Sequence, residues 1–231
     1  MSADPVASKR KAFLALALRR AQPGSGSASA FLQNRTWGEL PVALDLECIT
    51  TPYLIVGGIA TALYMPQRLT LDLNLLVVAD DAPVLYRELV AAAYTQTGTL
   101  SIGRTNWRTP DGGVLDVIES REPWAPVAVR TPNRSPAGEP VIALPYLVLM
   151  KLVASRPQDL ADLSRMLGAA DEAMLDQVRE AVRMYRPEDS ADLESLITLG
   201  RLELAAGDAQ GAEDAPSTPD ERDRQERIEG Q

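Results

Sequence analysis

Three polar side chains stand in apolar, strand-like stretches, where a charge or an amide is costly without a partner. Asp72 and Asn74 belong to the run 71–78, and Asp116 belongs to the run 114–118. Because successive side chains of a strand alternate between its faces, Asp72 and Asn74 share one face. A neighbouring strand would bring Asp116 beside them. The spacing therefore predicts a cluster of oxygen atoms suited to acid–base or Mg²⁺ chemistry.

A pair of glycines precedes this cluster along the chain. Residues 53–56 read as a short strand, Gly57-Gly58 stops it, and residues 59–64 contain helix formers up to Pro66. A glycine turn between a strand and a helix leaves backbone N–H groups free to bind phosphate. The pattern predicts a phosphate-binding turn, with an ordinary tight turn as the alternative.

Other interpretations of the three polar residues stay open at this stage. Asp72 and Asn74 would also suit the solvent-facing side of a strand. Asp116 would also suit a local ion pair with Arg104 or Arg108 across the hairpin that the turn 109–113 predicts.

Lys151 is the third feature with a chemical interpretation. It is the only lysine outside the first 35 residues, in a chain that otherwise uses arginine. A compact ammonium group suits a phosphate pocket, and a lysine extending from a partly buried helix is the alternative. Asp159 and Asp162, three residues apart, are predicted to form helix-surface pairs with Arg156 and Arg165.

Two segments, 56–77 and 144–163, together resemble the nucleotidyltransferase fold superfamily. The resemblance is to minimal bacterial nucleotidyltransferases, which include the AbiEii-type toxins of type IV toxin–antitoxin systems. The shared pattern is a Gly-Gly turn, about a dozen residues, Asp-x-Asp on a strand and a third acid on a later strand. Here thirteen residues separate Gly58 from Asp72-x-Asn74, and Asp116 takes the third place. A helical segment with Lys151, Arg156, Asp159 and Asp162 completes a resemblance that covers about residues 36–167.

The resemblance implies transfer of a nucleoside monophosphate from an NTP to an acceptor, with two Mg²⁺ ions. It also implies an antitoxin or other protein as partner, and tRNA, another RNA, a protein or a small molecule as acceptor. Asp72 and Asp116 would be the catalytic residues. The implied nucleotide-binding residues are Gly57, Gly58, Arg68, Thr70 and Lys151, and the implied metal ligands are Asp72, Asn74 and Asp116.

Asn74 departs from the family pattern, because an amide supplies a neutral oxygen where the family has a carboxylate. Three outcomes follow from this. The chain is a slow enzyme, an enzyme that recruits Glu119, or a catalytically inactive module that binds a nucleotide, a protein or RNA. Glu119 faces the other side of a regular strand than Asp116, so its recruitment requires a bulge. RNA binding would use the basic N-terminus and arginines at strand ends, namely Arg104, Arg108, Arg121, Arg130 and Arg134.

Composition narrows the remaining function classes. The 231 residues include no histidine, which excludes Ser-His-Asp and Cys-His catalysis and His-ligated metal sites. The formal charge of −9 repels a nucleic-acid backbone in bulk, so any such contact must be local. A single cysteine, Cys48, fits a reducing compartment, and no apolar run approaches the roughly 20 residues of a membrane span. These features predict a cytoplasmic protein without a membrane partner.

The elements that must position these residues follow from periodicity and turn signals. A capping box at Thr36 predicts a helix that starts the folded body. The predicted strands are 53–56, 71–78, 100–108 and 114–119, and the predicted helices after that first one are 59–64, 83–95, 145–154, 158–167, 172–185 and 189–205. The fold class is therefore α+β, a mixed sheet flanked by helices and followed by a helical bundle, with the active surface in the groove between the two parts.

Four regions are predicted along the chain. They are a basic flexible arm with a linker at 1–35, a nucleotidyltransferase-like core at 36–140, a helical region at 141–205 and an acidic disordered tail at 206–231. Residues 9–20 of the arm are expected either to dock on a partner or to form a solvated segment that frays. The arm has a net charge of +5, and residues 205–231 have a net charge of −5.

Overall fold

The computed structural model describes residues 5–20, 46, 48–65, 73–100 and 103–213. Of Pro5, Arg20, Leu100 and residues 205–213 it describes the backbone alone. The predicted helix at Thr36, the linker at 23–30, the residues Arg68, Thr70 and Asp72 and the last 18 residues of the tail lie outside this part.

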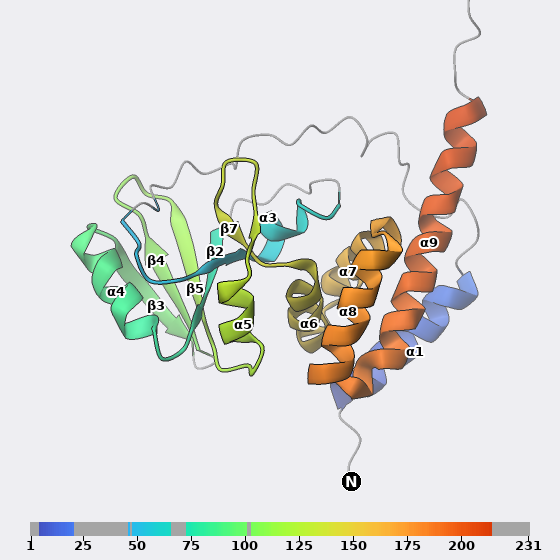
Figure 1. Ribbon diagram of the computed structural model, residues 1–231, viewed down its shortest axis with the longest axis horizontal. Coiled ribbons are helices and arrows are strands. Elements are labelled where there is room, and N and C mark those ends of the chain that lie inside the picture. The colour runs from blue at the N-terminus through green and yellow to red at the C-terminus, as the bar shows by residue number, and fades with distance from the viewer. Residues whose placement is uncertain (1–4, 21–45, 47, 66–72, 101–102, 214–231) are drawn as a thin grey trace, which may run out of the picture.

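A seven-stranded mixed sheet forms one end of the molecule (Figure 1). The strands are β1 (Leu54–Val56), β2 (Leu73–Val78), β3 (Thr95–Leu100), β4 (Arg104–Arg108), β5 (Val114–Ser120), β6 (Asn133–Arg134) and β7 (Pro140–Val141), in the order β3-β4-β5-β2-β1-β7-β6. The pairs β2–β5 and β1–β7 are parallel and the others are antiparallel. Leu75, Leu76 and Val77 are buried, so both faces of β2 are covered at the centre of the sheet.

Short helices connect the strands and cover the sheet. They are α3 (Gly57–Thr61), α4 (Ala82–Ala91) and α5 (Ala125–Arg130). Tyr86 of α4 packs against Trp107 of β4 with ring centroids 5.3 Å apart, which places α4 on the sheet face that carries Trp107. Trp124, which precedes α5, stacks on Tyr146 with centroids 5.8 Å apart.

Several element boundaries differ from the sequence prediction. The helix predicted for 83–95 ends at Ala91, because Ala93 adopts a positive φ of 63° and the chain turns into β3. Val90, near the end of α4, is 62% exposed. The strand predicted for 100–108 is shorter, because β4 covers only Arg104–Arg108, and Leu100 is the last residue of β3, a strand that was not predicted. Gly103, just before β4, has a φ of +69°. The connection 121–140 contains α5, β6 and part of β7, none of which was predicted.

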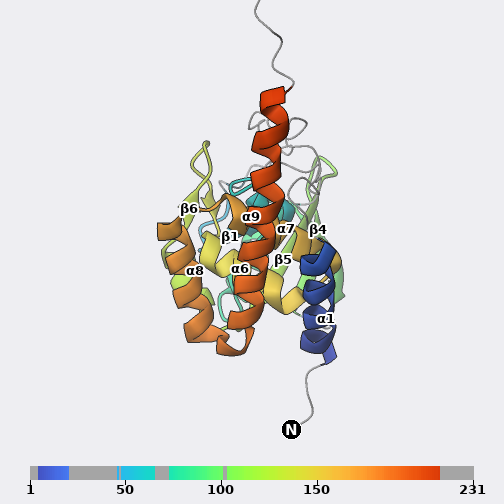
Figure 2. The ribbon, with the colours of Figure 1, turned by 90° about the vertical axis from the view of Figure 1, so that its right-hand side faces the viewer.

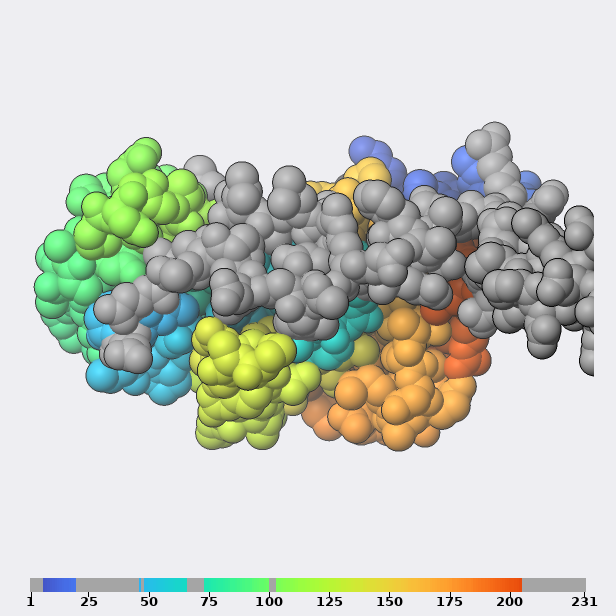
Figure 3. Space-filling model, turned by 90° about the horizontal axis from the view of Figure 1, so that it is seen from above, coloured from blue at the N-terminus to red at the C-terminus, as the bar shows by residue number. Residues whose placement is uncertain are grey.

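The C-terminal half is helical, as predicted. It consists of α6 (Leu144–Ala154), α7 (Pro157–Ala169), α8 (Glu172–Tyr185), a 3₁₀ turn (Pro187–Asp189) and α9 (Ser190–Glu213). The sheet and helices α7 to α9 lie at opposite ends of an elongated molecule (Figures 1 and 3), and α6 lies between them (Figure 1). Helix α9 continues eight residues past the predicted end at 205. Helices α7 and α9 approach closely at Gly168 and Gly200, where a methyl group on either glycine would overlap the backbone of the other helix. The α+β class, the mixed sheet and the helical C-terminus are thus confirmed.

The N-terminal helix α1 (Pro5–Arg20) lies against α9 (Figure 2). Arg10 is 3% exposed, and its guanidinium donates to Asp192 at 2.7 Å, to the Leu152 carbonyl at 2.8 Å and to Asp189. Residues 9–20 are therefore not a solvated segment, and the partner on which they dock is the chain's own helical region. Among the described residues, no helix has the length and apolar character needed to cross a membrane.

Candidate functional site

The alignment of three strands brings polar side chains into one row across the sheet. Asn74 of β2 lies opposite Asp116 of β5, and Asp116 lies opposite Asn106 of β4. Arg104, two residues before Asn106, has its side chain on the same face because strand side chains alternate. We call Asn74, Arg104, Asn106 and Asp116 the Asp116 cluster.

Hydrogen bonds engage both oxygens of the Asp116 carboxylate. Arg104 Nη2 donates to Asp116 Oδ2 and, at 3.2 Å, to Asn74 Oδ1. Asn106 Nδ2 donates to Asp116 Oδ1. Because Asp116 is only 5% exposed, its charge depends on these donors. The ion pair with Arg104, one of the two alternatives that the sequence left open, is therefore present.

The Gly57-Gly58 turn lies beside this cluster. Val56 pairs with Asn74, so the turn directly follows the point where β1 meets the cluster. Gly57 has a φ of +72°, and a Cβ atom there would lie 3.1 Å from Asn74 Nδ2. Only glycine combines this backbone conformation with so close an approach. The helix predicted for 59–64 is α3, which begins at Gly57 and has only five residues, so its dipole adds little to phosphate binding at the turn.

A second set of charges faces the turn from α6 and α7. Lys151 Nζ donates to Asp162 at 2.7 Å and to Asp159 at 3.2 Å, and all three residues are buried. Arg156, before α7, donates to Asp159 at 2.6 Å, and Gln158 donates to Asp162 at 3.1 Å. The predicted pair of Asp159 with Arg156 is present, but the predicted surface location is wrong, since both carboxylates are buried against Lys151 of α6. We call these five residues the Lys151 cluster.

The charge balance of the Lys151 cluster shifts the acidity of one member. Burial alone would raise the pKa of Asp159. The hydrogen bond from Arg156 and the charge of Lys151 outweigh that effect and leave the pKa of Asp159 below its usual value. The Asp159 carboxylate therefore holds Lys151 in place as an anion at neutral pH.

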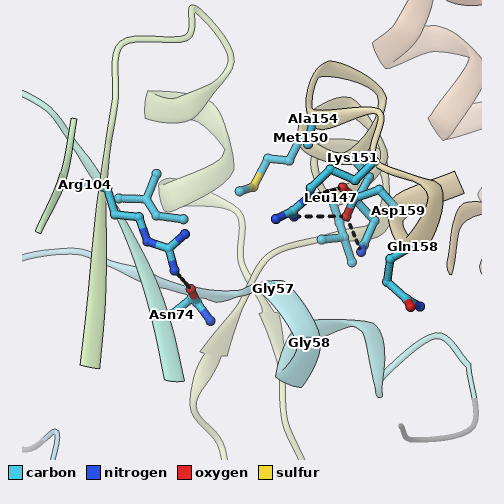
Figure 4. Close-up of a pocket in the computed structure, with 12 residues that line it drawn as sticks. Gly57, Gly58, Asn74, Arg104, Leu147, Met150, Lys151, Ala154, Gln158 and Asp159 are labelled. Atoms are coloured by element: carbon cyan, nitrogen blue, oxygen red, sulfur yellow. Dashed lines mark hydrogen bonds and ion pairs between the residues drawn. The ribbon is translucent and has the colours of Figure 1, made fainter. Parts of the chain in front are cut away.

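A cavity of about 340 Å³ lies between the two clusters (Figure 4). Its size lies within the range of small-molecule sites. Arg104 and Asn74 reach it from the sheet, Lys151 and Asp159 from the helices, and Gly57-Gly58 closes one side. The remaining lining residues are Ile118, Leu147, Met150, Ala154, Arg156 and Gln158. The predicted groove between the sheet and the helical part is present, and we call it the cleft.

Five of the predicted site residues meet here: Gly57, Gly58, Asn74 and Lys151 line the cleft, and Asp116 lies behind Arg104 and Asn74. Arg68, Thr70 and Asp72 are outside the described residues. Glu119 does not join them, because it accepts a hydrogen bond from Tyr86 on the opposite face of the sheet. The sequence analysis missed Asn106, although counting back from the hairpin turn at 109–113 places it opposite Asp116.

The described part of this site does not suit Mg²⁺. Of the four residues of the Asp116 cluster only Asp116 is a carboxylate, its two oxygens already accept hydrogen bonds, and a guanidinium lies against it. In the part of the chain that the structure describes, no three carboxylate or thiol side chains gather as a metal site would require. What the cleft does present is cationic N–H donors from Arg104, Lys151 and Arg156, each of which is also paired with a buried carboxylate. Such groups bind an anion.

Comparison with known proteins adds structural similarity of low degree. No family model matches the chain, and no curated protein matches its sequence. Among solved structures, the solution structure of the antibiotic-resistance factor ANT(2'')-Ia has 15% identity and a TM-score of 0.36, over 70% of this chain and 88% of that chain. ANT(2'')-Ia in complex with adenylyl-2''-tobramycin has 17% identity and a TM-score of 0.34, over 65% and 87%. The lincomycin-bound lincosamide antibiotic adenylyltransferase LnuA has 13% identity and a TM-score of 0.33, over 59% and 89%.

Proposed function

We propose that the cleft binds a nucleoside triphosphate, with its phosphates against Gly57-Gly58 and the basic side chains. One observation carries this proposal: three basic residues from separate elements, Arg104, Lys151 and Arg156, line one cavity together with a glycine turn. Guanidinium and ammonium groups are the side chains that proteins use to bind phosphate. The apolar side chains of Leu147 and Met150 offer a surface for the sugar and base.

The ion pairs of the clusters support this proposal by fixing the cations in place. Lys151 is held by two buried carboxylates, and these bonds use two of the three N–H donors of its ammonium group. Arg104 is held by Asp116 and Asn74. A site whose donors are held before the ligand arrives loses less side-chain entropy on binding than one that must order them.

A steric block at Ala154 tests whether the cleft is the binding site. Ala154 lines the cleft and is exposed, so Ala154→Trp fills it without disturbing the core. We expect calorimetric titration with each of the four NTPs to show binding to the native chain, and this variant to lose at least about tenfold in affinity. Val153→Trp is the matched control, because Val153 is exposed on the same helix outside the cleft. Equal losses in both variants, or no NTP binding to the native chain, would contradict the proposal.

Nucleotidyl transfer to an acceptor is the second candidate function. It is favoured by the pairing of Asn74 with Asp116 on adjacent strands, two of the three positions that the family resemblance requires. The third, Asp72, immediately precedes β2 in the sequence. Incubation with an α-labelled NTP and a cell extract, followed by a search for labelled RNA, protein and small molecules, tests this candidate. Label that persists in Asp72→Ala would contradict it.

The toxin role is a finer part of the second candidate and rests on the resemblance alone. It predicts that expression arrests growth, that an antitoxin encoded next to it relieves the arrest, and that Asp72→Ala abolishes it. Growth arrest that persists in Asp72→Ala would separate toxicity from nucleotidyl transfer.

A further inference from the structure

We infer that Arg104 supplies, at the Asp116 cluster, the positive charge that a divalent cation would otherwise supply, and that the cleft binds its nucleotide without such an ion. This inference rests on the proposed nucleotide cleft and specifies its ligand as a metal-free nucleoside triphosphate. The family resemblance gives no residue this role, because it implies that the oxygens at these positions bind metal ions.

The geometry of one nitrogen atom is the first argument. Arg104 Nη2 contacts both Asn74 Oδ1, at 3.2 Å, and Asp116 Oδ2, so it bridges two oxygens as a shared cation would. Asn106 takes the other oxygen of Asp116. A divalent ion at these oxygens would lie against the Arg104 guanidinium and be repelled by its charge unless Arg104 moved away. Metal binding and the Arg104 bridge therefore compete for the same atoms.

The sheet itself holds Arg104 in this position. Arg104 pairs with Ile118 in the antiparallel β4–β5 ladder, two residues along each strand from the pair formed by Asn106 and Asp116. The neighbouring side chain, Thr105, is buried on the opposite face, so β4 cannot turn over without exposing its core. The bridge is thus a product of strand register.

The surroundings of Arg104 make its departure unfavourable. Asp116 is buried, and the loss of its cation would leave a carboxylate with the neutral donor Asn106. Arg104 also has an unused donor, since its buried Nε has no hydrogen-bond partner among the described residues. Because Arg104 lines the cleft, an anionic ligand there would offer an acceptor to a guanidinium that is already in place. The nucleotide, and not a metal ion, is the partner that this arrangement favours.

Binding of Mn²⁺ in the absence of nucleotide tests the competition directly. We expect electron paramagnetic resonance to show weak binding to the native chain, and Arg104→Met to bind Mn²⁺ at least about tenfold more tightly because Asn74 and Asp116 are released. Arg108→Met, an exposed position on the same strand, is the control and should match the native chain. Native binding as tight as that of Arg104→Met would overturn the inference. If Arg104→Met does not fold, Arg104→Lys is measured in its place. A rise in Mn²⁺ affinity over the native chain, smaller than the rise expected for Arg104→Met because a positive charge remains, supports the inference. An affinity equal to the native value overturns it.

Calorimetric titration with the four NTPs, in EDTA and in Mg²⁺, tests the nucleotide half. We expect the native affinity to differ less than about threefold between the two conditions, and Arg104→Met to lose at least about tenfold in EDTA. Native binding that appears only in Mg²⁺ would overturn the inference while leaving the proposed cleft intact. A chain that binds no NTP in either condition would remove the proposed function and the metal-free nucleotide with it, and the Mn²⁺ comparison alone would then decide whether Arg104 holds the cation position.

Discussion

Gly57 and Asn74 show how single residues decide the shape of the site. Asn74 accepts a hydrogen bond from Arg104, and a Cβ atom added at Gly57 would lie 3.1 Å from Asn74 Nδ2. An aspartate at position 74 would present a second carboxylate to Arg104 in place of an amide. Gly57 and the Asn74 amide therefore lie against each other, and a substitution of either residue should change the position of the other.

Gly57→Ala tests this contact. Both Gly57 and Gly112 have positive φ, so an alanine at either position should lower the free energy of unfolding by about 1–2 kcal/mol. Only at Gly57 would the new Cβ press on Asn74, since a Cβ at Gly112 has no neighbour within 4 Å. We expect calorimetry to show weaker NTP binding in Gly57→Ala and native affinity in Gly112→Ala. Native affinity in both would separate the turn from the site.

The sequence predicted which residues lie in the site more accurately than it predicted which side chains they contact. Alternation on β2 and the pairing of Asp116 with an arginine follow from strand geometry, and both were predicted. The burial of Asp159 and Asp162 did not follow, because it depends on the packing of α7 against α6, which periodicity within one helix does not reveal. A buried carboxylate and a surface one have the same spacing in sequence.

At the scale of elements, the C-terminal helices were predicted from the sequence more accurately than the strands. Helices α6 to α9 have long apolar faces and prolines at or near the first turn of α6 and α7, so their positions were predicted closely. Strand β3, with the sequence TQTGTL, lies at the edge of the sheet and has no alternating apolar pattern. Strands β6 and β7 have two residues each, which is too short for any periodic signal.

Lys151→Met tests how the Lys151 cluster joins α6 to α7. The variant leaves two buried carboxylates with only their weaker partners, so we expect chemical denaturation at neutral pH to show a loss of about 3–5 kcal/mol. Arg156→Met is the control, because the Arg156 side chain is 71% exposed and its ion pair should contribute less than about 1 kcal/mol. Equal losses in the two variants would mean that the cluster acts at the surface.

The effect of Lys151→Met should depend on pH. The pKa of Asp159 is lowered in the folded chain, partly by the charge of Lys151. A carboxyl group with a lowered folded pKa adds stability above its unfolded pKa, near 3.9, and loses that stability as the pH falls through the folded value. We therefore expect the difference in free energy of unfolding between native and variant chains to shrink below about pH 4. A difference that is constant down to acid unfolding would exclude this electrostatic origin.

At the scale of the whole molecule, the first helix ties the two ends of the sequence together within the helical half. Alone, α1 would be marginal, because a helix of 16 residues in water gains little from its own hydrogen bonds. Within the chain, Arg10 joins α1 to the end of α6 and the start of α9 through the Leu152 carbonyl, Asp189 and Asp192. No local pattern predicts this contact, since its partners lie more than 140 residues away.

Arg10→Met tests whether α1 is part of the folded body. The substitution keeps most of the side-chain volume but leaves Asp192 buried without its cation, and leaves Asp189 with Arg186 alone. Removal of one member of a buried charge cluster costs about 3–5 kcal/mol, so we expect a large drop in the free energy of unfolding. Lys11→Met changes the neighbouring, exposed residue and should cost less than about 1 kcal/mol. If both variants unfold like the native chain, α1 is an appendage. If only Arg10→Met is destabilised, residues 5–20 are part of the folded helical half of the protein. The charge of Arg10 is then buried within the chain and does not take part in binding a partner molecule.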